Sequence, residues 1–228
     1  MNISIQNIIL DLFDIGAIEF GAFKFKHHEK YPDAPLAPMK INLRTPNHPN
    51  GGRLTPNIVS RIAFLFLDLI EEYNLEFDCV AGIPRAGDPF ARIVANILDK
   101  PLITAEKIEI GGKREISKVI SSRTLQPGQK VLLIDDVITK GYSKKESVQC
   151  FEKAGLEIAA IILLIDREEG GMDAYTKLGY NIYAVLTISE MLNFGLLQGK
   201  ISPVQHERCF SYMMQASQKD TKNRKNLN

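Results

Sequence analysis

The strongest constraint on the fold of this chain is segment 131–143, where an apolar strand leads into two carboxylates and a glycine-containing turn. The unbroken apolar run 131–134 is typical of an inner strand of a parallel sheet. Residues 144–154 then place Val148, Phe151 and Ala154 at helical spacing. We therefore expect the turn between strand and helix at the carboxyl edge of the sheet, where open α/β sheets bind ligands.

The remaining pattern alternates strands with helices. We expect core strands at 79–83, 102–103, 158–165 and 180–186, and helices at 3–15, 58–70 and 90–98. This alternation predicts an α/β fold with a parallel sheet and helices on both faces. Strands at 20–26 and 39–43 predict a small N-terminal hood, residues 16–54, over the site. The polar, glycine-containing segment 106–129 is interpreted as a loop that forms a mobile lid.

Composition favours one ordinary domain. The 228 residues include 28 Lys and Arg against 27 Asp and Glu, so the formal net charge is +1 and nothing favours a nucleic-acid partner. The longest apolar run, 158–165, is too short to cross a membrane, and no signal-peptide pattern begins the chain, so a cytoplasmic protein is expected. We expect one domain at 1–218 and a disordered tail at 219–228. Three separated cysteines predict buried thiols, and the four histidines are expected to be surface polar residues.

The turn after the apolar strand has the chemistry of a sugar-phosphate site. Asp135 and Asp136 can accept hydrogen bonds from vicinal hydroxyls, whereas Thr139, Ser143 and the amides that begin the helix can hold a phosphate. Gly141 permits a close approach or a positive φ. A purely structural turn is the alternative, but the complete order of strand, acids, turn and helix favours a ribose 5-phosphate.

These residues resemble the PRPP-binding motif of the type I phosphoribosyltransferases. That motif has two acidic residues, an apolar pair and a Thr-x-Gly-x-Ser/Thr phosphate loop, and the resemblance implies that the whole loop binds PRPP. Lys140 and Tyr142 lie between its fixed positions, where side chains ordinarily face solvent.

The wider resemblance is to orotate phosphoribosyltransferases and covers about residues 12–192. It rests on 13–18, 20–23 and 185–192, and most closely on 164–171, which resembles Leu-Asp-Arg-Glu-x-Gly-Gly. The resemblance implies that Arg167 contacts the orotate carboxylate and that Lys26 contacts base or pyrophosphate. Arg167 also follows a buried strand and offers a planar fork suited to a carboxylate. A surface ion pair with Glu168 or Asp166 is the alternative.

The implied reaction displaces pyrophosphate from C1 of PRPP by a ring nitrogen of orotate, giving orotidine 5′-monophosphate. Its transition state resembles an oxocarbenium ion, so the protein must position two anions and exclude water, and no side-chain nucleophile is needed. Mg²⁺ would be held mainly by substrate oxygens, with Asp135 as a candidate protein ligand. The resemblance also implies a homodimer whose lid cations cover the pyrophosphate.

The sequence departs from the family in three places. The cations expected in the lid are displaced, so Lys107, Lys113, Arg114 and Lys118 are candidates to replace them, although a solvated charged loop is equally compatible with the pattern. The pyrophosphate turn has Arg85 where a tyrosine is usual, and Lys40 and Asn42 alter the hood. Three hypotheses stay open: an active orotate phosphoribosyltransferase, which we favour, a PRPP-binding regulatory protein without transferase activity, and an enzyme for another base.

Overall fold

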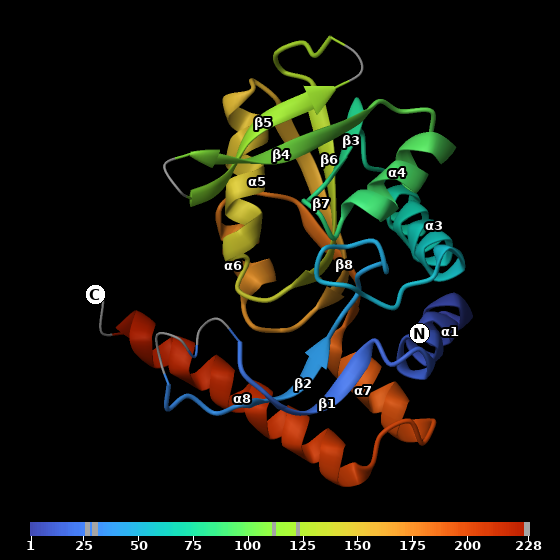
Figure 1. The fold of residues 1–228 in the computed structure, drawn as a ribbon, viewed down its shortest axis with the longest axis vertical. Coiled ribbons are helices and arrows are strands. Elements are labelled where there is room, and N and C mark those ends of the chain that lie inside the picture. The colour runs from blue at the N-terminus through green and yellow to red at the C-terminus, as the bar shows by residue number, and fades with distance from the viewer. Residues whose placement is uncertain (26–27, 29–31, 111–112, 122–123, 226–228) are drawn as a thin grey trace.

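The computed structural model describes residues 1–25, 28, 32–110, 113–121 and 124–225. Within them, a six-stranded sheet has the spatial order β5-β4-β3-β6-β7-β8 (Figure 1). The pairs from β4 to β8 are parallel, and β5 is antiparallel to β4. The strands are β3 (Cys79–Gly82), β4 (Leu102–Ile110), β5 (Lys113–Ser121), β6 (Lys130–Ile138), β7 (Glu157–Asp166) and β8 (Ile182–Thr187). The predicted α/β fold is confirmed.

Helices cover both faces of the sheet. Helices α3 (Pro56–Glu72) and α4 (Asp88–Ile97) pack on one face, and α5 (Tyr142–Lys153) and α6 (Gly171–Lys177) pack on the other. The strands divide their side chains between the two: Leu132 and Ile134 of β6 join the first core, whereas Val131 and Leu133 join the second. Successive strand residues point to opposite faces, so an unbroken apolar run is what a doubly covered strand requires.

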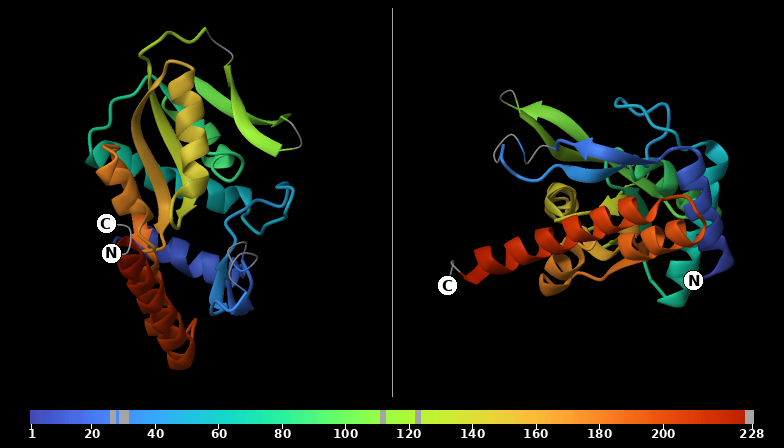
Figure 2. Two further views of the ribbon diagram at one scale, coloured as in Figure 1. Left: turned by 90° about the vertical axis from the view of Figure 1, so that its left-hand side faces the viewer. Right: turned by 90° about the horizontal axis from the view of Figure 1, so that it is seen from below.

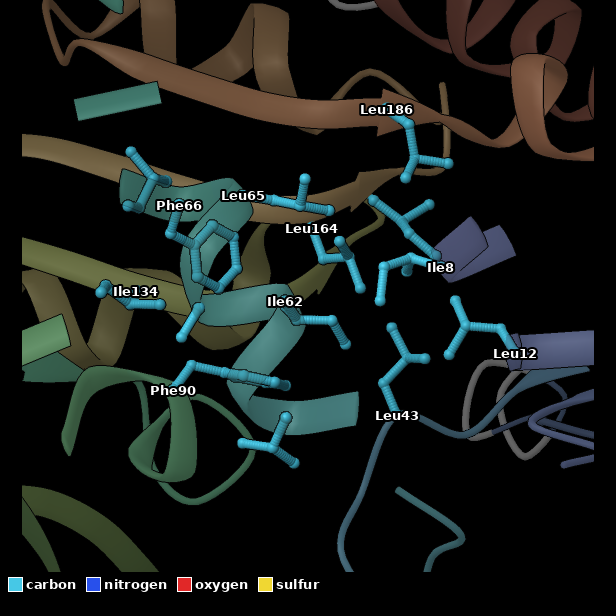
Figure 3. Packing of buried hydrophobic residues seen from close by; sticks show 14 of the residues in the cluster. Ile8, Leu12, Leu43, Ile62, Leu65, Phe66, Phe90, Ile134, Leu164 and Leu186 are labelled. Carbon is cyan, nitrogen blue, oxygen red and sulfur yellow. The ribbon is translucent and has the colours of Figure 1, made fainter. Parts of the chain in front are cut away.

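The larger core joins the sheet to the N- and C-terminal parts of the chain. Figure 3 shows Ile8 and Leu12 of α1 (Ile3–Asp14) packed toward Leu164, Leu186 and the helices. The rings of Phe66 and Phe90 meet edge to face, with centroids 5.7 Å apart. This packing ties α3 to α4 and holds the start of α4 against the sheet.

The predicted hood is a two-stranded antiparallel sheet of β1 (Ile18–Phe23) and β2 (Ala37–Ile41). It lies beside the lower end of the main sheet in Figure 1, next to the long C-terminal helix α8 (Pro203–Lys225). Strand β2 of the hood contacts α8, and Figure 2 shows both from two further sides. Helix α7 (Ile188–Leu197) connects β8 to this region.

The interpretation of 106–129 as a loop is wrong for most of its length. Strands β4 and β5 pair antiparallel from Ile103↔Ser121 to Ile110↔Lys113, with a register irregularity between Glu106 and Lys107. Ile108 and Ile110 alternate in β4, as in a strand with one apolar face, but Ile116, Val119 and Ile120 of β5 do not alternate, so the strand pattern is weak. The lid therefore extends the edge of the main sheet as a hairpin.

Two smaller differences concern individual segments. Strand β6 runs through Asp135 and Asp136 to Ile138 and does not stop before the carboxylates. Helix α8 continues to Lys225, into the segment expected to be a tail, and the domain boundaries stay predictions.

The burial of single residues also differs in part from the expectation. His28 is buried, whereas a surface position was expected, and the three cysteines are buried free thiols, as predicted. Within the described ranges, no helix is both long and apolar enough to span a bilayer.

Candidate active site

The carboxylates of Asp135 and Asp136 lie at the carboxyl end of β6 in different surroundings. Asp135 is buried, and its Oδ1 accepts a hydrogen bond from the backbone N–H of Asp136 over 2.9 Å. Asp136 is only half-buried, and its Oδ1 accepts one from the backbone N–H of Val137 over 2.7 Å. Burial and the Asp135 carboxylate raise the pKa of Asp136, and the ammonium of Lys144 opposes this. Asp136 is thus the more accessible of the two acids.

A buried lysine beneath the pair escaped the sequence analysis. Lys144 in the first turns of α5 is 2% exposed, and its Nζ donates hydrogen bonds to Asp135 Oδ2 over 2.5 Å and to the carbonyl of Val137 over 2.7 Å. The doublet of Lys144 and the exposed Lys145 resembles an ordinary solvated helix surface, so no sequence signal separated them. A buried ammonium is tolerated because it is paired and hydrogen-bonded.

The turn between β6 and α5 has the predicted form. Gly141 adopts φ 78°, and a Cβ there would lie 2.6 Å from the ring of Tyr175. The hydroxyl of Tyr175 donates to the Gly141 carbonyl over 3.0 Å. Thr139 is exposed and Lys140 half-buried. The amides that begin α5 therefore stand at a fixed turn, which is the arrangement that binds phosphate groups.

A second turn, between β3 and α4, is pinned against β6. Ile83 N–H donates to the Ile134 carbonyl over 2.8 Å, and a Cβ on Gly87 would lie 2.0 Å from that same oxygen. Arg85 projects from this turn and is exposed. Burial lowers the pKa of His48, and the guanidinium groups of Arg44 and Arg85 lower it further. The loop that follows β2, which contains Arg44 and His48, thus adds positive charge beside Arg85.

Asp88, the first residue of α4, is a third carboxylate at this edge that the sequence analysis missed. Its Oδ1 is buried without a hydrogen-bond partner among the described residues. Burial raises the pKa of Asp88 to about 6, with a further contribution from Asp135, while Arg92 and Arg85 oppose it. Its sequence context, before a proline at a helix start, indicates only a favourable charge near a helix N-terminus.

Arg167 lies where the sequence predicted it, at the end of β7 beside the phosphate turn. Its backbone N–H donates to the Ile138 carbonyl over 3.0 Å, and its side chain is largely buried. Nε lies 3.0 Å from Glu169 Oε1, an ion pair without the alignment of a hydrogen bond. The guanidinium stands over the ring of Phe25, 6.0 Å from its centroid, which brings the end of β1 to the same place.

The ion pair of Arg167 with Glu168 or Asp166, considered as the alternative from sequence, is not the one in the structure. Glu168 Oε2 instead accepts a hydrogen bond from the backbone N–H of Ser189 over 2.9 Å at the start of α7. Asp166 Oδ1 accepts one from Glu168 N–H over 2.9 Å. The positive φ of Glu168, 55°, turns its side chain toward α7, so Glu169 is left to face Arg167.

Helix α8 adds a phenol to the surroundings of Arg167. Burial and Glu169 raise the pKa of Tyr212, while Arg167 and Lys140 oppose the rise. Tyr212 is therefore close both to Lys140 in the turn before α5 and to Arg167 at the end of β7. Sequence reasoning missed Tyr212 because no local pattern places it beside Arg167.

Several predicted site residues are outside this description. Lys26 lies outside the described residues, and so do the side chains of the lid and turn residues Lys107, Lys113, Arg114, Lys118, Tyr142 and Ser143. Among the described residues, no cluster of three or more His, Cys, Asp or Glu side chains could hold a metal ion. The two acids of β6 nevertheless offer the hard oxygen atoms that Mg²⁺ prefers when substrate oxygens supply its other ligands.

Comparison with known protein families shows which family this chain belongs to. Residues 53–184, from the loop before α3 into β8, match the model of the phosphoribosyl transferase domain. The chain belongs to the phosphoribosyl transferase family. The matched region contains the acidic pair, both glycine turns and Arg167, so the phosphoribosyl transferase core includes every part of the site except the hood, α7 and α8.

Among the phosphoribosyl transferases, the chain is similar to orotate phosphoribosyltransferases and to uridine 5′-monophosphate synthases. The chain is 30% identical over 182 residues to the orotate phosphoribosyltransferase of Sulfolobus acidocaldarius, covering 78% of this chain and 85% of that protein. It is 30% identical over 204 residues to uridine 5′-monophosphate synthase of Bos taurus, of which it spans 39%. The structure of Leishmania donovani UMP synthase superposes with a TM-score of 0.75 at 25% identity, over 92% of this chain and 42% of that one.

Proposed function

We propose that this protein transfers the 5-phosphoribosyl group from PRPP to orotate, giving orotidine 5′-monophosphate and pyrophosphate in pyrimidine biosynthesis. The observation that carries this proposal is the hydrogen bond from Arg167 N–H to the Ile138 carbonyl, 3.0 Å long. It joins the strand end that bears the carboxylate-binding cation to the strand that bears the acids and the phosphate turn. A ribose phosphate and an acidic base can therefore meet at one edge of the sheet.

The phosphate turn and the acids would hold the ribose 5-phosphate. The amides at the start of α5 and the Thr139 and Ser143 hydroxyls bind the phosphate, because the helix N-terminus and the turn concentrate N–H donors there. Lys140 and Tyr142 are the neighbouring residues of that loop. Asp136 accepts hydrogen bonds from the ribose hydroxyls, since it is the less buried of the two acids.

The base would lie between the hood and Arg167. The planar guanidinium can donate two parallel hydrogen bonds to the orotate carboxylate, displacing the loosely aligned Glu169. Phe25 offers an aromatic face beside that cation, and Lys26 follows it in the hood. This arrangement favours a planar base that bears a carboxylate over an uncharged one.

Catalysis would then consist of positioning and charge stabilisation. A ring nitrogen of orotate forms the new bond to C1 while the bond from C1 to the pyrophosphate oxygen breaks. Pyrophosphate leaves with that electron pair, and the proton of the ring N–H is released. Arg85, Lys107, Lys113 and Arg114 neutralise the leaving group and, with the hairpin, exclude water. Mg²⁺, bound mainly by PRPP oxygens beside the acidic pair, supplies further neutralisation when present.

Three features of the working enzyme belong to the same proposal. It acts as a homodimer, with one protomer's β4–β5 hairpin covering its partner's site. It is cytoplasmic, and it works as a single domain over residues 1–218. Nucleic acid and membrane partners are not part of this function.

The test is a direct assay with purified protein, PRPP, Mg²⁺ and orotate. The proposal predicts loss of orotate absorbance in step with release of pyrophosphate. A variant carrying Asp135→Asn and Asp136→Asn serves as the blank and should show neither signal. Tight PRPP binding without turnover would reject the enzyme and favour a PRPP-binding regulatory protein.

A further inference from the structure

Lys144 has an unusual position for a helix lysine, because its ammonium is buried directly beneath the acidic pair. Its hydrogen bonds end on Asp135 Oδ2 and on the Val137 carbonyl, and both acceptors belong to β6. Removing an ammonium from water is costly unless good partners replace the water. The two hydrogen bonds therefore fix the Lys144 side chain to the end of β6.

These contacts make the two carboxylates differ in how readily they can bind a cation or a hydroxyl group. Both oxygens of Asp135 are engaged within the protein, Oδ1 by the Asp136 amide and Oδ2 by Lys144. Asp136 Oδ1 accepts a hydrogen bond from the Val137 amide, and its carboxyl group also interacts with that of Asp135. Asp136 is only half-buried, whereas Asp135 is buried. The Lys144 ammonium lies 2.5 Å from Asp135 Oδ2, so its positive charge opposes the binding of a divalent cation at that carboxylate.

Resting on the proposed PRPP site, we propose that Lys144 is a positioning residue that engages Asp135. Asp135 then does not coordinate Mg²⁺, and the half-buried Asp136 presents its carboxylate to the ribose. The ammonium also places a positive charge at the point where a metal ion would otherwise meet two carboxylates. The acidic pair of the protein without PRPP therefore binds Mg²⁺ weakly.

The first test replaces the lysine by an uncharged side chain of similar length, Lys144→Met, and measures Mn²⁺ binding without PRPP by electron paramagnetic resonance. Without the ammonium, Asp135 is free to bind a cation together with Asp136, so Mn²⁺ should bind at least tenfold more tightly than to the wild type. Lys145→Met is the matched control, because Lys145 is exposed on the same helix, and its Mn²⁺ affinity should equal that of the wild type.

Steady-state kinetics give a second readout that a purely structural lysine would not move selectively. In Lys144→Met the KM for PRPP should rise at least tenfold, because the acids that receive the ribose lose their fixed arrangement, while the KM for orotate stays within twofold. A folded Lys144→Met protein with wild-type Mn²⁺ affinity and wild-type KM for PRPP would overturn the proposal.

A variant with both charges removed, Asp135→Asn/Lys144→Met, covers the case in which the single variant does not fold. Because no buried charge is left unpaired, this protein should fold, and its complex with PRPP should bind Mn²⁺ within threefold of the wild-type complex. A tenfold loss would show that Asp135 is a metal ligand and would overturn the proposal.

Neither metal measurement requires transfer to a base. If wild-type protein bound PRPP but did not consume orotate, the proposed function would fail, whereas tighter Mn²⁺ binding by Lys144→Met would still support the role of Lys144. The two claims can therefore fail separately.

Discussion

The hydroxyl of Tyr175 donates a hydrogen bond to the carbonyl oxygen of Gly141 across 3.0 Å, and its ring fills the space that a side chain at 141 would need. Gly141 also has φ 78°, a region that favours glycine. The shape of the phosphate turn thus depends on the side chain that Gly141 lacks and on the tyrosine from α6 behind it.

Gly141→Ala should raise the KM for PRPP at least tenfold. The substitution adds about 1 kcal/mol of backbone strain, and its Cβ must also displace the Tyr175 ring, which lies 2.6 Å away. Steady-state kinetics measure the change. Gly128→Ala is the control, because Gly128 has φ 82° with no atom within 4 Å of the added Cβ, so it shares the strain without the collision. An equal rise in both variants would contradict this role of the turn.

Arg167→Lys should raise the KM for orotate at least tenfold and leave the KM for PRPP within twofold. A lysine keeps the charge but loses the planar pair of donors that a carboxylate needs, and tenfold corresponds to about 1.4 kcal/mol. Arg53→Lys is a control, since Arg53 is an exposed arginine that donates a hydrogen bond to the Ile15 carbonyl at the end of α1. A larger rise in the KM for PRPP than in the KM for orotate would contradict the assignment of Arg167 to the orotate carboxylate.

Asp88→Asn should stabilise the protein at pH 8 and have little effect at pH 3.5. The pKa of Asp88 is raised from 3.8 to about 6, so the folded state holds its proton more tightly than the unfolded state does. Stability is therefore lost as pH rises from about 4 through about 6, and asparagine removes that loss. Thermal unfolding across this range, with the exposed Asp68→Asn as control, measures it. An equal shift in Tm at both pH values would refute the assignment.

Removing the positive charges at the hairpin turn, Lys113→Ala/Arg114→Ala, should lower kcat at least tenfold with little change in Tm. These residues begin β5, the edge strand of the sheet, and pair with Ile110 and Glu109. Loss of charge stabilisation on the leaving pyrophosphate explains the expected fall. Lys177→Ala, an exposed lysine at the end of α6, should leave kcat unchanged. A kcat within twofold of the wild type would contradict this role of Lys113 and Arg114 and leave Arg85 as the candidate cation.

The parts of the site that were predictable from sequence are those carried by contiguous residues. The apolar run of β6, the acids, Gly141 and the start of α5 follow one another, so strand and helix periodicity place them at one edge. Arg167 was placed by its position after a buried strand. In each case a local pattern determined where the functional atoms lie.

The parts that were missed depend on contacts distant in sequence or on a choice between similar patterns. Lys144 and Lys145 differ only in which one the strand end buries, and Asp88 becomes unusual because the fold buries it and brings Asp135 near it. Segment 106–121 was interpreted as a loop because its charges outnumber its apolar residues. As an edge hairpin it needs only one apolar face, so its pattern is weak.

The central claim is tested most directly by identifying the product when the protein is incubated with PRPP, Mg²⁺ and either orotate or uracil. Uracil has the same ring without the carboxylate that Arg167 is proposed to bind. The account predicts a nucleotide with the mass of orotidine 5′-monophosphate from orotate, at a rate at least a hundredfold above that of any product from uracil. Equal rates with both bases, or PRPP bound without a nucleotide from either, would contradict it.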